Sequence, residues 1–179
     1  MTQGFRSIAA VALAGALAAT VGGAPALANS YERYFAGKPG GRVCYTRAYD
    51  ADHLRARDRQ LVRQIVLDFD AGKSAGAANK AERFVIALGV KLRAGKAWLT
   101  HAGQCAARAD GGFDCALEGN AGRFKLAPDD VSLRMTLDGV MSLTGEKPVA
   151  IGGKESDEPA SLLSPAVNRI CDQAMGAAR

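Results

Sequence analysis

The chain has 179 residues, of which 48% are hydrophobic, and a formal net charge of +5 at pH 7. This length suits one ordinary domain with a hydrophobic core of its own. Both signs of charge are interspersed along the chain, without the concentrated basic patch and interleaved aromatic residues of a nucleic-acid binder, so we expect no nucleic-acid partner.

The first 28 residues have the three parts of a secretory signal peptide. Arg6 precedes an apolar run from Ile8 to Val21, and Ala26-Leu27-Ala28 then provides an A-x-A cleavage site. The run is shorter than the roughly 20 residues that a membrane-spanning helix needs. The sequence therefore predicts a signal peptide at 1–28, a periplasmic or secreted location and no stable insertion into a membrane.

The rest of the chain divides into a lead-in, one domain and a tail. Residues 29–41 are polar and contain glycine and proline, which predicts a flexible lead-in. We place a single β domain at 42–175 and a short tail at 176–179.

The domain begins with a segment whose pattern changes twice. Residues 42–49 alternate and include β-branched and aromatic side chains, which predicts a strand. Residues 50–60 are charged, and Asp50 is placed to cap a helical turn. Residues 61–70 fit both a helical stripe and an alternating strand, and we prefer the strand because their neighbours are strands.

Four arginines lie close together in this region: Arg55, Arg57, Arg59 and Arg63. Asp58 interrupts them, so a solvated, charged segment explains them better than a nucleic-acid site does. A weak preference for anionic components of the cell envelope remains.

The stretch 83–137 alternates apolar and polar residues between closely spaced turn signals such as Asp110-Gly111-Gly112 and Pro128-Asp129-Asp130. Short strands joined by turns at such regular intervals predict an antiparallel meander. One face of these strands is expected to form the core: Phe84, Ile86, Leu88, Val90, Leu92, Val131, Leu133, Met135 and Leu137.

The last part of the chain is predicted to be loop followed by helix. Residues 145–160 are mostly loop-forming, with room for a short strand at Val149–Ile151. Ser164-Pro165 resembles the N-cap and first position of a short amphipathic helix. The whole pattern predicts an all-β fold, either a small antiparallel β-barrel of about eight strands or a β-sandwich, with a short C-terminal helix.

The chain has four cysteines, all after the signal peptide. An even number in an exported chain predicts disulfides, and four cysteines allow three pairings. Cys105 and Cys115 flank a turn signal, which favours a bridge across one hairpin and leaves Cys44 to pair with Cys171. Their spacings are not those of a zinc site, so we expect no metal and no cofactor.

A longer motif begins at the first cysteine. Residues Cys44–Leu54 have the pattern Cys-x-x-Arg-x-Tyr-Asp-x-x-His-Leu. Further along the chain come Trp98, Gly103, Cys105, Cys115 and Gly122-Arg123-Phe124. This order resembles a group of small exported proteobacterial proteins of unassigned function, over Arg42 to Leu137. The resemblance implies a compact exported β domain and supplies no reaction and no site residues.

The sequence offers no catalytic motif. It lacks a G-x-S-x-G nucleophile motif, and its only histidines are His53 and His101. The glycines at Gly152-Gly153-Lys154 do not have the spacing of a phosphate-binding loop. We therefore predict that the chain is not an enzyme and assign no catalytic residues.

One constellation predicts a ligand site at the mouth of the barrel. If the alternation of their strands turns them inward, the residues that converge are Arg47, Arg63, His101, Tyr45 and Tyr49. Arginine binds carboxylate and phosphate groups in a two-pronged geometry, so such a site would suit an anionic or amphipathic ligand. The alternative is that each cation extends from the rim into water.

We therefore expect an exported, non-enzymatic binding domain, with an anionic or amphipathic small molecule of the envelope as its ligand. A periplasmic inhibitor, or a domain that recognises an envelope protein, is the alternative. An enzyme of unknown type is the third choice.

Overall fold

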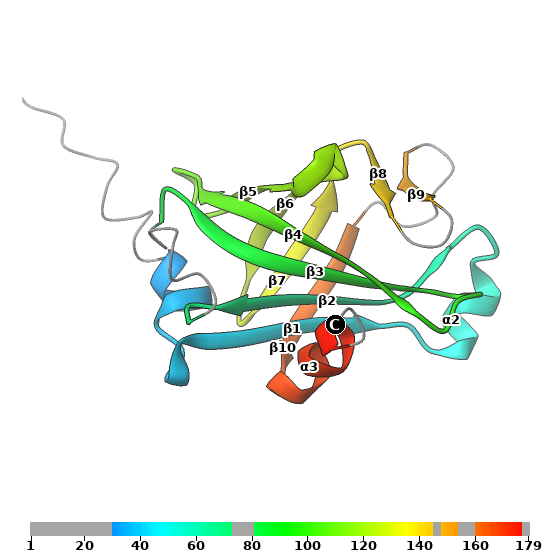
Figure 1. The fold of residues 1–179 in the computed structure, drawn as a ribbon, viewed down its shortest axis with the longest axis horizontal. Coiled ribbons are helices and arrows are strands. Elements are labelled where there is room, and N and C mark those ends of the chain that lie inside the picture. The colour runs from blue at the N-terminus through cyan, green and yellow to red at the C-terminus, as the bar shows by residue number, and fades with distance from the viewer. Residues whose placement is uncertain (1–29, 73–80, 145–147, 154–159, 177–179) are drawn as a thin grey trace, which may run out of the picture.

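The computed structural model describes residues 30–72, 81–144, 148–153 and 160–176. Eight antiparallel strands close into a barrel in the order β1-β10-β7-β6-β5-β4-β3-β2 (Figure 1). These strands are β1 (Arg42–Ala48), β2 (Val62–Asp70), β3 (Phe84–Leu92), β4 (Trp98–Ala107), β5 (Phe113–Leu117), β6 (Gly122–Asp129), β7 (Ser132–Leu137) and β10 (Ala160–Ala166). The predicted all-β barrel is confirmed. The predicted signal peptide at 1–28 and residues 177–179 of the predicted tail lie outside the described residues.

The alternation that predicted the strands also sorts their side chains. In β5, Phe113, Cys115 and Leu117 are buried, whereas Asp114 and Ala116 are exposed. Successive side chains of a strand point to opposite faces, so each strand of a barrel gives every second residue to the core. The predicted core residues of β3 and β7 that are buried are Phe84, Ile86, Leu88, Val90, Leu133 and Met135, with Leu92 and Leu137 packed against them.

The predicted core position of Val131 is wrong, because this residue is 59% exposed. Asp130 has a φ of 54°, in the left-handed region, and Val131 follows it in the turn between β6 and β7. The pairing of Asp129 with Ser132 closes that turn. The turn therefore ends one residue later than predicted, and the buried alternation starts after Val131.

Helix α3 (Asn168–Gly176) packs on the outside of β1 to β4 (Figure 1). Cys171 and Ala174 of the helix are fully buried, and so is Val66 on the outer face of β2. Both faces of β2 are thus covered, one by the core and one by α3. This explains why 61–70 fitted a helix as well as a strand, since a strand buried on both faces loses its alternation.

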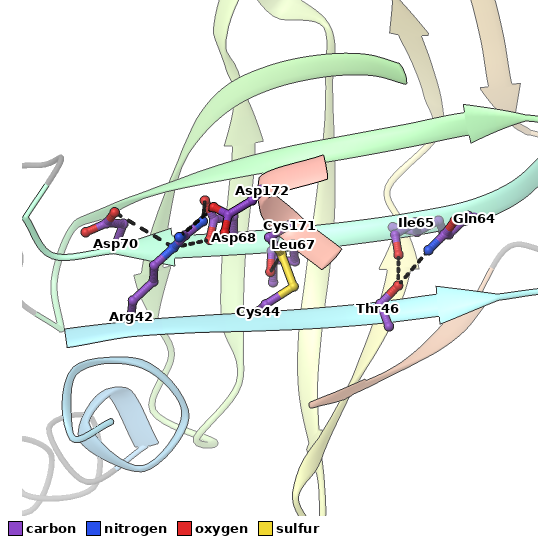
Figure 2. The surroundings of a disulfide bond; sticks show 10 residues. All are labelled: Arg42, Cys44, Thr46, Gln64, Ile65, Leu67, Asp68, Asp70, Cys171 and Asp172. Carbon is purple, nitrogen blue, oxygen red and sulfur yellow. Dashed lines mark hydrogen bonds and ion pairs between the residues drawn. A yellow bond between two sulfur atoms is a disulfide. The ribbon is translucent and has the colours of Figure 1, made fainter. Parts of the chain in front are cut away.

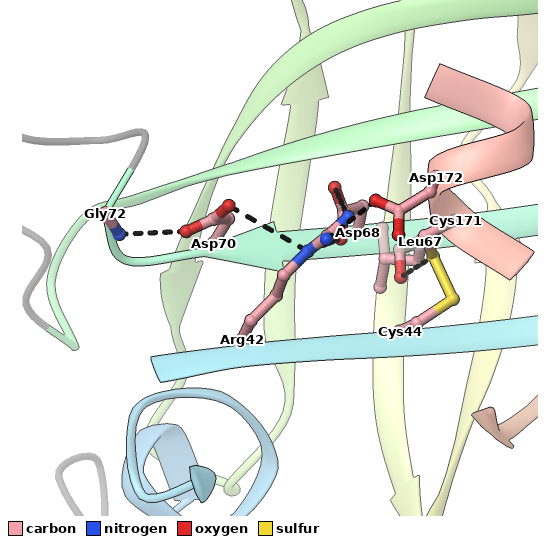
Figure 3. A network of polar contacts seen from close by, with 8 residues as sticks. All are labelled: Arg42, Cys44, Leu67, Asp68, Asp70, Gly72, Cys171 and Asp172. Carbon is pink, nitrogen blue, oxygen red and sulfur yellow. Dashed lines mark hydrogen bonds and ion pairs between the residues drawn. A yellow bond between two sulfur atoms is a disulfide. The ribbon is translucent and has the colours of Figure 1, made fainter. Parts of the chain in front are cut away.

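A disulfide and an ion pair join α3 to the barrel. The Cys44–Cys171 disulfide joins β1 to the helix, with Cα atoms 5.8 Å apart (Figure 2). Next to it, the Arg42 guanidinium donates from Nε and Nη2 to the two carboxylate oxygens of Asp68, at 3.1 and 3.2 Å, and its Nη1 lies 2.7 Å from Oδ1 of Asp172 (Figure 3). The Asp68 hydrogen bonds raise the pKa of Arg42 further above its ordinary value, while the cation compensates a carboxylate that is only 4% exposed.

The second predicted disulfide, Cys105–Cys115, also forms, between paired residues of β4 and β5. Both predicted pairings are therefore confirmed. Disulfides persist in oxidising compartments, so the two bridges suggest a non-cytoplasmic environment.

The expected flexible lead-in at 29–41 is corrected by the structure, because its described part closes one end of the barrel. Tyr31, Tyr34 and Phe35, in or next to the single turn η1 (Glu32–Ala36), are at most 5% exposed. The ring of Phe35 lies 4.7 to 6.2 Å from the rings of Tyr45, Phe69, Phe84 and Phe113. Three aromatic residues within five positions bury enough apolar surface to order this short polar segment.

The opposite end of the barrel carries α2 (Ala51–Ala56), the β3–β4 turn and a small hairpin. This hairpin pairs β8 (Val140–Leu143) with β9 (Val149–Gly152), the strand expected near Val149–Ile151. Its buried side chains Met141, Leu143 and Ile151 join the barrel core.

The predicted N-cap at Ser164-Pro165 is wrong, because both residues belong to β10 and α3 begins later, at Asn168. Pro165 pairs with Tyr45, one residue before the end of the strand. The fixed φ of proline fits an extended segment, and a place near the strand end limits the loss of ladder hydrogen bonds.

Candidate functional site

Two of the five predicted ligand-binding residues, Tyr45 and His101, are engaged in contacts within the fold. Tyr45 is 0% exposed, and its hydroxyl donates to the carbonyl of Tyr34 at 2.9 Å. Burial raises the pKa of the Tyr45 hydroxyl. Tyr45 therefore packs against the aromatic closure of the barrel and contributes no open binding surface.

His101 lies on β4, and the register places the buried residues Leu67 and Leu88 between it and Tyr45. Its Nε2 accepts a hydrogen bond from the backbone amide of Thr144, at 3.1 Å, beyond the end of β8. Burial lowers the pKa of His101, which favours the neutral ring that this hydrogen bond needs. The structure thus uses His101 to hold the β8–β9 hairpin against the barrel wall.

The other three predicted residues come together at the α2 end. The guanidinium carbon of Arg47 lies 4.9 Å from the ring centroid of Tyr49, within cation–π range. The backbone amide of Tyr49 donates to the carbonyl of Arg63 at 2.9 Å, and its hydroxyl lies 2.7 Å from Oγ of Ser161. Tyr49 is therefore fixed by hydrogen bonds at both its backbone and its hydroxyl. Its ring contacts the Arg47 guanidinium, and its backbone lies beside that of Arg63.

A second ring was not predicted at this site. His53 stacks on Tyr49, with centroids 4.8 Å apart and planes 24° apart. Asp50 caps α2, as predicted, by accepting the amide of His53 at 2.7 Å. The His53 Nε2 lies 3.0 Å from Oε1 of Gln60, which is 2% exposed. The sequence signal that could have predicted this contact is the spacing of Asp50 and His53, because a helix cap binds the amide three positions later.

Arg63 is exposed because the strand bulges at its position. The register of β2 against β3 shifts between Val62 and Gln64, so that Arg63 has no opposite residue on β3. A bulge turns one side chain away from the direction that strict alternation gives it. The prediction that Arg63 faces inward with Ile65 is therefore wrong, and its side chain extends into solvent.

Two connections meet at this end of the barrel. The amide of Arg93, in the β3–β4 turn, donates to the carbonyl of Leu61 at 2.7 Å, and its guanidinium donates to the carbonyl of Leu54 at 2.9 Å. The turn therefore lies beside the β1–β2 connection. We call residues 47–63 and 91–97 together the basic end.

Positive charge outweighs negative charge at the basic end. Its cations are Arg47, Arg55, Arg57, Arg59, Arg63, Lys91, Arg93 and Lys96, and its carboxylates are Asp50, Asp52 and Asp58. The resulting excess of five charges equals the formal charge of the whole chain, +5. Such an excess over a small surface produces a positive potential that attracts anions.

Aromatic and aliphatic side chains fill much of the interior of the described barrel. The largest fully buried residues include Tyr45, Phe35, Phe69, Phe84, Phe113 and Phe124. A depression of about 200 Å³ lies elsewhere, on the outer wall over β4, β5 and β6. It carries both signs of charge, with Glu82, Arg83, Asp114 and Arg123 among its lining residues.

Among the described residues, no three His, Cys, Asp or Glu side chains lie close enough together to hold a metal ion. No helix in this part of the chain is long and apolar enough to span a membrane.

Comparison of the chain with protein-family models, with curated proteins and with solved structures found no match. The resemblance to small exported proteobacterial proteins therefore stays a prediction.

Proposed function

We propose that this chain is an exported, non-enzymatic binding domain that holds an anionic partner against its basic end. The observation that carries the proposal is the excess of positive charge on two connections and the strand ends that flank them, where hydrogen bonds hold the two connections together. Export remains part of the proposal, supported by the signal-peptide pattern of 1–28 and by the two disulfides.

The contacts of Tyr49 support a binding surface of defined shape. Its ring contacts both Arg47 and His53, and its hydroxyl is engaged with Ser161. A guanidinium held over a ring has lost part of its freedom, so less conformational entropy remains to be lost when it binds an anion. Arg63, placed nearby by the bulge, offers a second guanidinium to solvent.

The location of the proposed site differs from the one predicted from the sequence. Tyr45 and His101 are engaged within the fold, so we assign binding to the rim around Arg47, Tyr49 and Arg63 and leave the barrel lumen out. The same end offers the surface on which an envelope protein of negative charge would bind. The anion is the feature that both kinds of partner share.

The direct test is a titration of the protein with a soluble polyphosphate, in which calorimetry measures the affinity. The Arg63→Ala variant should bind more weakly by about 1–3 kcal/mol, because a charge-assisted hydrogen bond is lost. Lys125→Ala is the matched control, since Lys125 is an exposed cation on the outer face of β6. Equal affinities of the two variants and the wild type would reject the assignment of the site.

A further inference from the structure

Apolar side chains are exposed at the same end of the barrel as the excess cations. Leu61 is 50% exposed and lies between Arg59 and Arg63 in the chain, and Val140 at the start of β8 is 54% exposed. The carbonyl of Leu61 is fixed by the amide of Arg93. A single exposed leucine is ordinary, but a leucine flanked by Arg59 and Arg63 and bonded to the turn that carries Arg93 makes an amphipathic surface.

The cations around Leu61 are spread over two connections and do not surround one cavity. Exposed positions include Arg55 and Arg59 on the β1–β2 connection, Arg63 at the start of β2, and Arg93 and Lys96 in the β3–β4 turn. An array of long cationic side chains suits an extended negative surface, to which each cation adds about fivefold in partitioning.

The opposite end of the barrel lacks this character where it is described. Arg108 forms ion pairs with Asp110 and Asp114, and Arg134 forms one with Asp129. Positive charge in these contacts is compensated within the chain, whereas the basic end has eight cations against three carboxylates, one of which, Asp52, pairs with Arg55. A negatively charged surface would therefore attract one end of the molecule, the basic end, more strongly than the other.

From this geometry we propose that the basic end docks on the surface of an anionic phospholipid bilayer, with the side chain of Leu61 entering the headgroup region. This proposal rests on the binding function proposed above and names its partner. A shallow contact of this kind combines electrostatic attraction with burial of a small apolar area, and it is reversible. In this orientation the α2 end of the barrel faces the membrane, and the end closed by Phe35 faces away from it.

The test uses the chain as a bacterial host exports and processes it, with its mass measured to verify that residues 1–28 are absent. Co-sedimentation is measured with vesicles of phosphatidylglycerol and phosphatidylcholine, and with vesicles of phosphatidylcholine alone. We expect binding to the first kind of vesicle only. Raising the sodium chloride concentration should weaken it, because salt screens exposed charges.

Two variants with matched controls locate the contact. Arg63→Ala should lower partitioning into the anionic vesicles about fivefold, and Leu61→Ser should lower it as well. Lys125→Ala and Val131→Ser should bind like the wild type, since Val131 is 59% exposed at the opposite end. Circular dichroism of each variant verifies that it is folded.

The outcomes separate this proposal from the one on which it rests. Absence of vesicle binding, together with polyphosphate binding that Arg63→Ala weakens, would overturn the bilayer proposal and leave the proposed function in place. Absence of binding to both probes would overturn both. Vesicle binding that falls equally in Leu61→Ser and Val131→Ser would overturn the proposed orientation.

Discussion

The environment of His101 links the stability of the fold to pH. Its neutral Nε2 accepts the amide of Thr144, and burial lowers its pKa from the ordinary 6.5. The unfolded chain therefore takes up the proton at a higher pH than the folded chain does. The stability that neutral His101 contributes is fully present above pH 6.5 and is lost as the pH falls from 6.5 through the folded-state pKa.

Urea unfolding at a series of pH values from about 8 to about 5 checks this linkage. The variant His101→Gln retains a hydrogen-bond acceptor and does not titrate. The wild type should lose more free energy of unfolding than the variant across this range. Parallel losses in the two proteins would contradict the role assigned to His101.

Phe35 should be among the most sensitive positions of the fold. It is fully buried and contacts four aromatic rings that come from four different strands. Phe35→Ala should lower the free energy of unfolding by about 3–5 kcal/mol, because it leaves a large cavity. Denaturant unfolding measures the loss, with the exposed neighbour Glu32→Ala as the control. A loss below about 1 kcal/mol would mean that this segment does not close the barrel.

At the scale of elements, the sequence predicted most where one face of a strand is buried. The alternation in β3, β5 and β7 matches the structure because apolar residues at every second position of a strand predict which side chains are buried. β2 was ambiguous because α3, about 100 residues later, covers its outer face. The sequence did not predict that Tyr31 to Phe35 close one end of the barrel. The local sequence of a polar lead-in does not indicate whether its aromatic residues pack against strands that follow later in the chain.

The two disulfides should differ in their contribution to stability. The Cys44–Cys171 bridge spans 127 positions and the Cys105–Cys115 bridge spans 10. The loop-entropy model gives roughly 5 kcal/mol for the longer loop and roughly 3 kcal/mol for the shorter one. Replacing both cysteines of a pair by alanine and measuring denaturant unfolding compares them. The reverse order would show that strain or packing, and not chain entropy, determines their contributions.

At the scale of the whole molecule, the candidate site was only partly predictable. Arg47, Tyr49 and Arg63 were named from strand faces; Arg47 contacts the ring of Tyr49, whereas Arg63 lies beside Tyr49 only through its backbone, at a bulge that alternation cannot reveal. The contribution of Arg93 could not be predicted, because only barrel closure brings its turn to the β1–β2 connection. The excess positive charge comes from residues 47–63 and 91–97 together, and only the fold brings these two segments to one place.

The central claim is that the basic end is the surface that binds an anion. The most direct measurement is a two-dimensional amide NMR titration of the processed chain with soluble polyphosphate. The account predicts that the largest shift changes lie within residues 47–63 and 91–97 and that they diminish as salt is added. Largest changes around Gln104 and Arg123, at the depression on the outer wall, or no changes at all, would contradict it.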